Sequence, residues 1–218
     1  MDDDGVPVED LMKLKLIVVG NQSTGKSCIL NRFVNETFEE NYQATIGLDF
    51  QSKNVTIHDQ DVRLILYDTA GQEKFRSLIP MYIREAQIIL LIYDISDRES
   101  FDSMPNWLRE VMEVKNSEAV FALIGNKIDL ENERKITKEQ GQNFAETNKL
   151  NLFIESSAKT GFNSKKVFIK AAKMLYDEHL KYKDVEEGAT TGGTEVQTEK
   201  KKLEIINQPD NKKKKGCC

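Results

Sequence analysis

The chain has 218 residues and a formal net charge of -5, and it is 39% hydrophobic and 31% charged. This length suits one domain plus a tail, and it can bury a core without disulfides or a structural metal. The acidic total argues against a nucleic-acid footprint. The apolar runs are far shorter than the roughly 20 residues that a membrane helix needs. The acidic start, Met1–Asp4, lacks the basic and apolar parts of a secretory signal.

Predicted strands and helices alternate along the chain. A buried strand over 14–19 leads through a glycine-containing turn into a helix over 26–34, and strands over 50–58 and 62–67 form a hairpin around the polar turn 59–61. The later elements are a strand over 88–95, a helix over 102–115, a strand over 120–125, a helix over 138–148, a strand over 152–155 and a helix over 164–182. This alternation predicts an α/β fold whose mostly parallel sheet is covered by helices on both faces, with one hairpin making the sheet mixed.

Composition divides the chain into three parts. Residues 1–12 are expected to form a flexible acidic N-terminus, and residues 13–182 the folded domain. Residues 183–218 are rich in Gly, Thr, Glu, Lys and Asn, so they are expected to form a flexible tail. Four consecutive lysines at 212–215 make the end of this tail locally basic.

The segment Gly20–Ser27 matches the pattern G-x-x-x-x-G-K-S between a predicted strand and a predicted helix. In this pattern backbone N–H groups face phosphate oxygens, Lys26 adds positive charge, and the Ser27 hydroxyl binds Mg²⁺. The alternative is a chance match in an ordinary strand-turn-helix. The phosphate-binding residues expected here are Gly20, Ser23, Thr24, Gly25, Lys26, Ser27 and Cys28. Within the helix, the side chain of Cys28 is more simply interpreted as a small buried thiol.

A second motif, which begins at Asp68, follows the strand that ends at residue 67. A carboxylate at this position can hold Mg²⁺ through a water molecule. The N–H of Gly71 can meet a γ phosphate, and Gln72 can orient an attacking water. Taken alone, Asp68 is more simply a cap or turn residue.

Two further segments predict recognition of a base. In Asn126–Asp129, which follows the strand ending at 125, a buried Asp129 carboxylate could accept both donors of one edge of guanine. Adenine has an acceptor at N1, so Asp129 would be left unpaired and adenine would be rejected. Ser157, Ala158 and Lys159 could close over the base with backbone N–H groups. Each segment, taken alone, also fits an ordinary polar loop.

Thr45 lies in a polar stretch without predicted strands, 36–46. Its hydroxyl could complete the Mg²⁺ shell when a γ phosphate is present, so that the loop orders with the triphosphate and relaxes after hydrolysis. The simpler alternative is a solvated loop threonine.

Together these motifs resemble the Ras superfamily of P-loop GTPases over about residues 13–180. Within that span, Ile46–Phe50, Lys74–Ser77 and Leu91–Ile95 resemble segments of the Rab branch. A further set looks most like the sixth numbered Rab subgroup, which acts in Golgi trafficking: Tyr42–Gly47, Arg76–Pro80 and Tyr82–Arg84.

The resemblance implies a six-stranded Ras-like sheet with one antiparallel edge strand, GTP or GDP bound with Mg²⁺, and slow GTP hydrolysis. It implies that Phe38 packs edge-on against guanine, that Lys127 flanks the base, and that Ala158 contributes its N–H. The resemblance also implies that Tyr42 is one of the nucleotide-binding residues. The catalytic residues so implied are Lys26, Thr45 and Gln72, and the metal-binding residues are Ser27, Thr45 and Asp68.

The resemblance also implies partners. These are exchange factors, GTPase-activating proteins, and a GDP-dissociation inhibitor or escort protein. Effectors such as tethers and motor adaptors would bind the switch regions and Phe50, Tyr67 and Tyr82, although Rab proteins usually carry Trp where Tyr67 stands. Geranylgeranyl groups on Cys217 and Cys218 would hold the protein on the cytoplasmic side of Golgi or vesicle membranes, with a cytosolic pool.

Two rival functions fit the phosphate-binding pattern alone. The first is a metabolic P-loop ATPase or kinase, against which Asn126 and Asp129 argue. The second is a nucleotide-binding scaffold that does not hydrolyse, against which Gln72 argues. Elsewhere Trp107 is expected in the core, and His58 and His179 lack the neighbours that a metal site needs.

Overall fold

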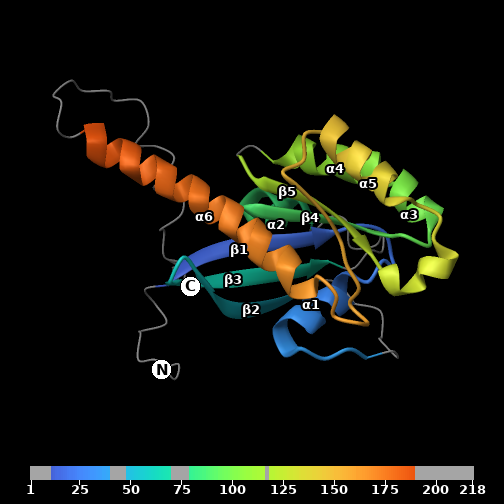
Figure 1. The fold of residues 1–218 in the computed structure, drawn as a ribbon. Helices are drawn as coiled ribbons and strands as arrows, with labels where there is room; N and C mark the ends of the chain where they lie inside the picture. Colours follow the sequence, from blue (N-terminus) through green and yellow to red (C-terminus); the bar gives the residue numbers. More distant parts are fainter. Residues whose placement is uncertain (1–10, 40–47, 70–78, 116–117, 190–218) are drawn as a thin grey trace, which may run out of the picture. The chain divides into compact units, whose positions relative to one another are not determined.

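A computed structural model describes residues 11–39, 48–69, 79–115 and 118–189. Its centre is a six-stranded sheet in the order β2-β3-β1-β4-β5-β6 (Figure 1). The strands are β1 (Met12–Val19), β2 (Leu48–Ile57), β3 (Gln60–Thr69), β4 (Ile88–Asp94), β5 (Val120–Asn126) and β6 (Leu152–Glu155). Among the strands of the described residues, only β2 and β3 pair antiparallel. The predicted mixed α/β sheet with one antiparallel edge strand is confirmed.

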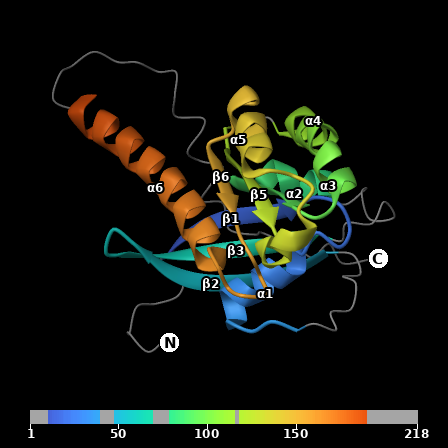
Figure 2. The ribbon, with the colours of Figure 1, turned by 45° about the vertical axis from the view of Figure 1, so that its right-hand side comes forward.

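Helices cover both faces of this sheet (Figure 2). They are α1 (Lys26–Asn35), α2 (Ile79–Glu85), α3 (Arg98–Asp102), α4 (Met104–Val114), the 3-10 helix η2 (Ile128–Glu133), α5 (Lys138–Thr147) and α6 (Ser164–Ala189). Alternate residues of β1 face opposite ways: Leu16 packs with α1 and α6, whereas Ile17 packs with α2, α4 and α5. Because both faces are covered, the central strands are continuous apolar runs, and every residue of β4 is buried.

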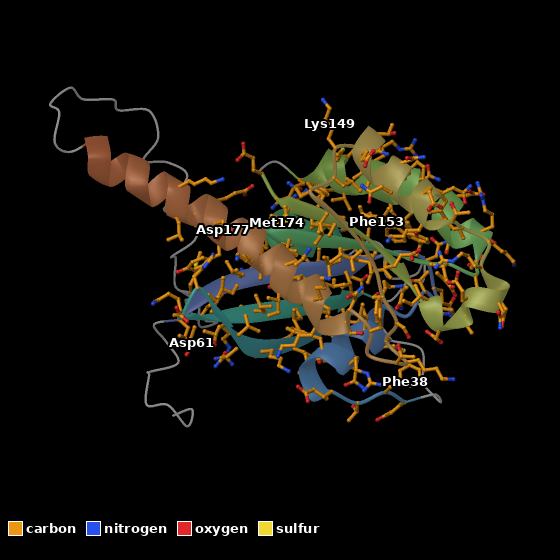
Figure 3. The ribbon with its side chains drawn as sticks, viewed as in Figure 1. Phe38, Asp61, Lys149, Phe153, Met174 and Asp177 are labelled. Atoms are coloured by element: carbon orange, nitrogen blue, oxygen red, sulfur yellow. The ribbon has the colours of Figure 1, made fainter. Side chains whose placement is uncertain are left out.

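The β2–β3 hairpin has a tighter turn than the sequence predicts. The turn consists of His58 and Asp59, whose φ angles are 50° and 60°, and Ile57 already pairs with Gln60. Two successive left-handed residues form a type I′ turn, whose twist matches that of the paired strands. The tip is tied to α6, because His58 Nε2 lies 2.7 Å from the carboxylate of Asp177, labelled in Figure 3.

The helices differ from the prediction in three ways. The helix predicted over 102–115 is α4, but a separate short helix, α3, precedes it, because the Asp97 side chain caps α3 by accepting from the N–H of Glu99 (3.1 Å). The short elements α2 and η2 are not predicted at all. The last helix runs to Ala189 rather than to 182, because the added residues are mostly good helix formers.

By the density of its internal contacts the chain divides into Met1–His179 and Leu180–Cys218. Within the described residues, none of the helices is both long and apolar enough to span a bilayer.

The topology brings the carboxyl ends of five strands to one edge of the sheet. Five strands run parallel to one another, so their carboxyl ends lie at the same edge: β1, β3, β4, β5 and β6. In open α/β sheets, ligands bind at this edge. The predicted motifs at Gly20, Asp68, Asn126 and Ser157 each begin near the end of one of these strands, whereas Thr45 does not.

Candidate functional site

The loop between β1 and α1 holds its backbone in conformations that require glycine. Gly25 has a φ of 87°, and a Cβ there would lie 2.5 Å from Asn126 Nδ2; a Cβ on Gly20 would lie 2.2 Å from the carbonyl oxygen of Ile92. The loop leads directly into the N-terminus of α1, where the N–H groups of the first turn and the helix dipole favour an anion. This geometry suits a phosphate group.

Lys26 is the buried cation of this loop, with only 5% of its surface exposed. Its ammonium donates to the carbonyl oxygens of Gly20 (3.0 Å) and Asn21 (2.7 Å). Burial lowers the pKa of Lys26 to about 8, and the negative charge of Asp68 opposes that shift. A phosphate anion at the loop would therefore stabilise a charge that the protein alone supports poorly.

Asp68 and Ser27 supply oxygen atoms beside the loop. Asp68, near the end of β3, is 3% exposed and lies in register with Val18 of β1. Ser27, half-buried, lies in the first turn of α1. Next to Asp68, Thr69 Oγ1 donates to the Val18 carbonyl (2.7 Å), which fixes the end of β3 against β1. Carboxylate and hydroxyl oxygens are suitable Mg²⁺ ligands.

Asn126 joins three segments of the site. It is fully buried, and its Nδ2 donates to the carbonyl of Thr24 (2.9 Å) in the loop after β1. Its Oδ1 accepts from Ser156 Oγ (3.4 Å) and from the N–H of Ala158 (3.3 Å). The side chain of Asn126 therefore holds the loops after β1, β5 and β6 together.

The next residue, Lys127, has a left-handed backbone with a φ of 66°. Its ammonium pairs with Asp94 at the end of β4 (2.7 Å), and its Cε would lie 3.9 Å from a Cβ on Gly25. Asp94 is 6% exposed and accepts from the Ser96 hydroxyl (2.6 Å). The sequence motif therefore omits Asp94, the acid that orients Lys127 along the loop.

Asp129 lies opposite the loop after β6. Its Oδ1 accepts from Ser157 Oγ (2.5 Å), and the Ser157 carbonyl in turn accepts from Ser164 Oγ (2.9 Å). The sequence interpretation treats Asp129 as buried, but the structure exposes it, because η2 contributes no buried residue. The two predicted base-binding segments are nevertheless in direct contact.

Sequence reasoning missed two polar side chains that support these loops. Trp107 lies in the core as predicted, but its indole N–H also donates to Asn21 Oδ1 (2.8 Å), and Asn21 Nδ2 donates to Ser103 Oγ (3.0 Å). Arg32 of α1 bonds the loop after β6. The phosphate-loop pattern leaves the position of Asn21 unspecified, and Arg32 falls outside every motif, so no sequence signal identified them.

Several predicted residues can be placed only in part. Phe38 is half-buried and packs against the core beside α1 (Figure 3). Cys28 is also half-buried, and burial raises the pKa of its thiol. Six predicted residues lie outside the described ranges: Tyr42, Thr45, Gly71, Gln72, Cys217 and Cys218.

A comparison with protein families matches residues 15–177 to the Ras family. This match covers well over half of the chain. The chain belongs to the Ras family.

Membership of the Ras family confirms the predicted class of protein. The chain is a small GTPase that binds guanine nucleotide and hydrolyses GTP. This excludes the metabolic ATPase or kinase and the scaffold without hydrolysis that the phosphate-binding pattern alone allows. The Ras-like sheet order agrees with the family.

Proposed function

We propose that this Ras-family GTPase belongs to the Rab branch and recruits effectors to membranes in vesicle trafficking, in a Golgi-related step. The observation that carries this proposal is an aromatic trio beside the nucleotide site. Phe50 on β2 lies opposite Tyr67 on β3, and the Tyr67 ring packs on Tyr82 of α2 with 5.0 Å between centroids. Phe50 is 71% exposed although Tyr67 is 9% exposed. An exposed aromatic side chain next to a packed pair of aromatic rings suits a protein partner.

Guanine would be recognised by the loops after β5 and β6. The Asp129 carboxylate accepts from the N1–H and the exocyclic amine, the Lys127 stem flanks one face of the ring, and Phe38 packs edge-on against the base. The N–H of Ala158, which also donates to Asn126 Oδ1 (3.3 Å), would be shared with the oxygen at position 6. The bound base would cover the exposed Asp129 carboxylate, which strengthens its hydrogen bonds by excluding water.

The phosphates and Mg²⁺ would lie between the loop after β1 and the end of β3. Within the described part of the chain, no three His, Cys, Asp or Glu side chains cluster as a metal site. Mg²⁺ commonly takes one or two protein ligands and completes its shell with water and phosphate oxygens, which fits Ser27, Asp68 and Thr45. When bound, Mg²⁺ supplies positive charge against the β and γ phosphates.

Hydrolysis would depend on positioning by the chain's own residues. Lys26 holds the phosphate oxygens, Gln72 orients the attacking water, and Gly71 donates its N–H to the γ phosphate. Residues 36–46 contain no Arg, so this loop offers no arginine to stabilise the developing charge. Slow intrinsic hydrolysis follows, accelerated by about 10³ to 10⁵ when a GTPase-activating protein inserts an Arg. Exchange factors would act on the other step of the cycle, the replacement of GDP by GTP.

Membrane attachment would come from prenyl groups on Cys217 and Cys218, delivered by an escort protein and extracted by a GDP-dissociation inhibitor. Two lipid chains anchor stably, whereas one gives marginal, reversible binding. The lysines at 212–215 add attraction to an anionic surface. The protein is then expected on the cytoplasmic face of Golgi or vesicle membranes.

The test compares partner capture by two nucleotide states. Protein loaded with a non-hydrolysable GTP analogue is expected to retain proteins from Golgi-enriched extracts that the GDP-loaded form does not. Phe50→Ala should reduce this capture by tenfold or more without changing GDP release, whereas Met112→Ala, a control residue 51% exposed on α4, should leave it intact. Equal capture by both nucleotide states, or full capture by Phe50→Ala, would contradict the proposal.

A further inference from the structure

The guanidinium of Arg32 bonds three backbone carbonyls from two distant segments. Its Nε donates to the carbonyl of Ala158 (2.8 Å) and its Nη2 to that of Lys159 (2.7 Å). Its Nη1 donates to the carbonyl of Glu36 (2.7 Å), just beyond α1. Arg32 thus links the helix that carries Lys26 with the loop after β6 and with the chain that leaves α1.

The two bonds to the loop after β6 set the direction of its N–H groups. A trans peptide is planar, so the carbonyl of Ala158 and the N–H of Lys159 point in opposite directions from one rigid unit. By holding this carbonyl, Arg32 aims the Lys159 N–H away from α1. The preceding peptide is held in the same manner, because the Ser157 carbonyl accepts from Ser164 Oγ (2.9 Å). The backbone N–H groups of this loop are therefore oriented by hydrogen bonds to the carbonyl oxygens of the same peptides.

The third bond fixes the chain that leads to Phe38. Glu36 ends α1 with a left-handed φ of 61°. The last carbonyls of the helix do not require Arg32, because Lys53 Nζ donates to those of Phe33 (2.7 Å) and Val34 (3.2 Å). Arg32 instead binds the carbonyl of Glu36, just beyond the helix. The Cζ of Arg32 lies 6.0 Å from the centroid of the Phe38 ring.

We propose that Arg32 is a positioning residue for guanine recognition. By holding the carbonyl of Ala158, it aligns the backbone N–H of Lys159 with the oxygen at position 6 of the base, next to the N–H of Ala158, and it fixes the approach of Phe38. Through these contacts Arg32 slows nucleotide release and increases the binding preference for a purine that carries an oxygen at position 6. The inference rests on the proposed base recognition. Lysine cannot replace Arg32, because a single ammonium lacks the planar fork that reaches three carbonyls.

The test measures dissociation of fluorescent GDP and fluorescent 6-thio-GDP in excess Mg²⁺. The sulfur of 6-thio-GDP is a weak acceptor, so it probes the donors of the loop after β6. Arg32→Ala is expected to release GDP about tenfold faster or more, and 6-thio-GDP much less so. The preference for GDP over 6-thio-GDP should therefore shrink severalfold. The control Arg63→Ala, whose side chain bonds Ser52 on β2 (3.1 Å), should leave both rates unchanged.

Two results would overturn the role of Arg32. One is GDP release from Arg32→Ala at the wild-type rate. The other is an equal acceleration for both nucleotides, which would indicate general loosening of the protein. Arg32→Lys keeps the charge and most of the bulk, and it is expected to show the same loss of preference, so it carries the test if Arg32→Ala does not fold. Failure of the wild type to bind GDP would instead contradict the proposed base recognition itself.

Discussion

The charge of Lys26 depends on what the surrounding loop binds. In the protein alone, this ammonium is buried among carbonyl oxygens, and burial lowers its pKa to about 8. A bound phosphate adds negative charge, favours the protonated form, and so raises this pKa again. Nucleotide binding and protonation of Lys26 are therefore linked.

We expect GDP binding to take up protons above pH 8. At pH 8.5 a free lysine with this pKa is roughly three-quarters deprotonated, so binding should take up most of one proton, and affinity should fall as the pH rises further. Calorimetry in two buffers that differ in ionisation enthalpy measures this uptake. At pH 7 Lys26 is already protonated in the free protein, so its contribution should vanish. An uptake at pH 8.5 no larger than at pH 7 would refute the linkage.

At the scale of single elements, the packing of α5 depends on the absence of a side chain. Gly141 is buried in α5, and a Cβ there would lie 2.5 Å from both Phe153 Cζ and the Tyr93 hydroxyl oxygen. Helix propensity alone favours Ala over Gly by about 1 kcal/mol. Overpacking opposes this, at a cost of about 1–3 kcal/mol.

We expect the cost of overpacking to exceed the gain in helix propensity, so that Gly141→Ala lowers the free energy of unfolding. Gln142→Ala, on the exposed side of the same helix, should change it by less than about 0.5 kcal/mol. Urea unfolding of the GDP-bound proteins compares the two. A Gly141→Ala variant as stable as the wild type would show that α5 can shift to make room.

The sequence predicts elements best where pattern and length are strong. All six strands and the helices α1, α4, α5 and α6 follow from apolar runs and helical spacing. The short α2, α3 and η2 have too few residues for a periodic pattern, and α3 depends on one capping contact from Asp97. The left-handed pair His58–Asp59 lacks the glycine that usually marks such a turn.

The residues of the site also differ in how far the sequence predicts them. Motif residues such as Lys26 and Asn126 are predictable because their chemistry and spacing are fixed by the phosphate and the base. Arg32, Asn21 and Asp94 act through tertiary contacts with segments far along the chain, and one sequence contains no signal for such contacts.

At the scale of the whole molecule, the proposed function joins a nucleotide switch to a lipid anchor at the end of a tail. Changing Cys217 and Cys218 to Ser should leave GDP affinity unchanged and move the protein to the cytosol, because both anchoring chains are lost. Changing only the lysines at 212–215 should weaken membrane binding without abolishing it, since each contributes at most about 1 kcal/mol. Fractionation of cells expressing each variant measures this, and a double-Ser variant that stays on membranes would rule out the lipid anchor.

The loops after β5 and β6 are proposed to recognise guanine through Asp129. Competition binding of GTP, XTP and ATP to the wild type and to Asp129→Asn tests it most directly. The wild type should prefer GTP strongly over both competitors. Asp129→Asn should lose GTP affinity and prefer XTP, because its amide can donate to the carbonyl that xanthine carries in place of the exocyclic amine. Equal affinity of the wild type for GTP and ATP, or an unchanged preference for GTP in Asp129→Asn, would contradict the account.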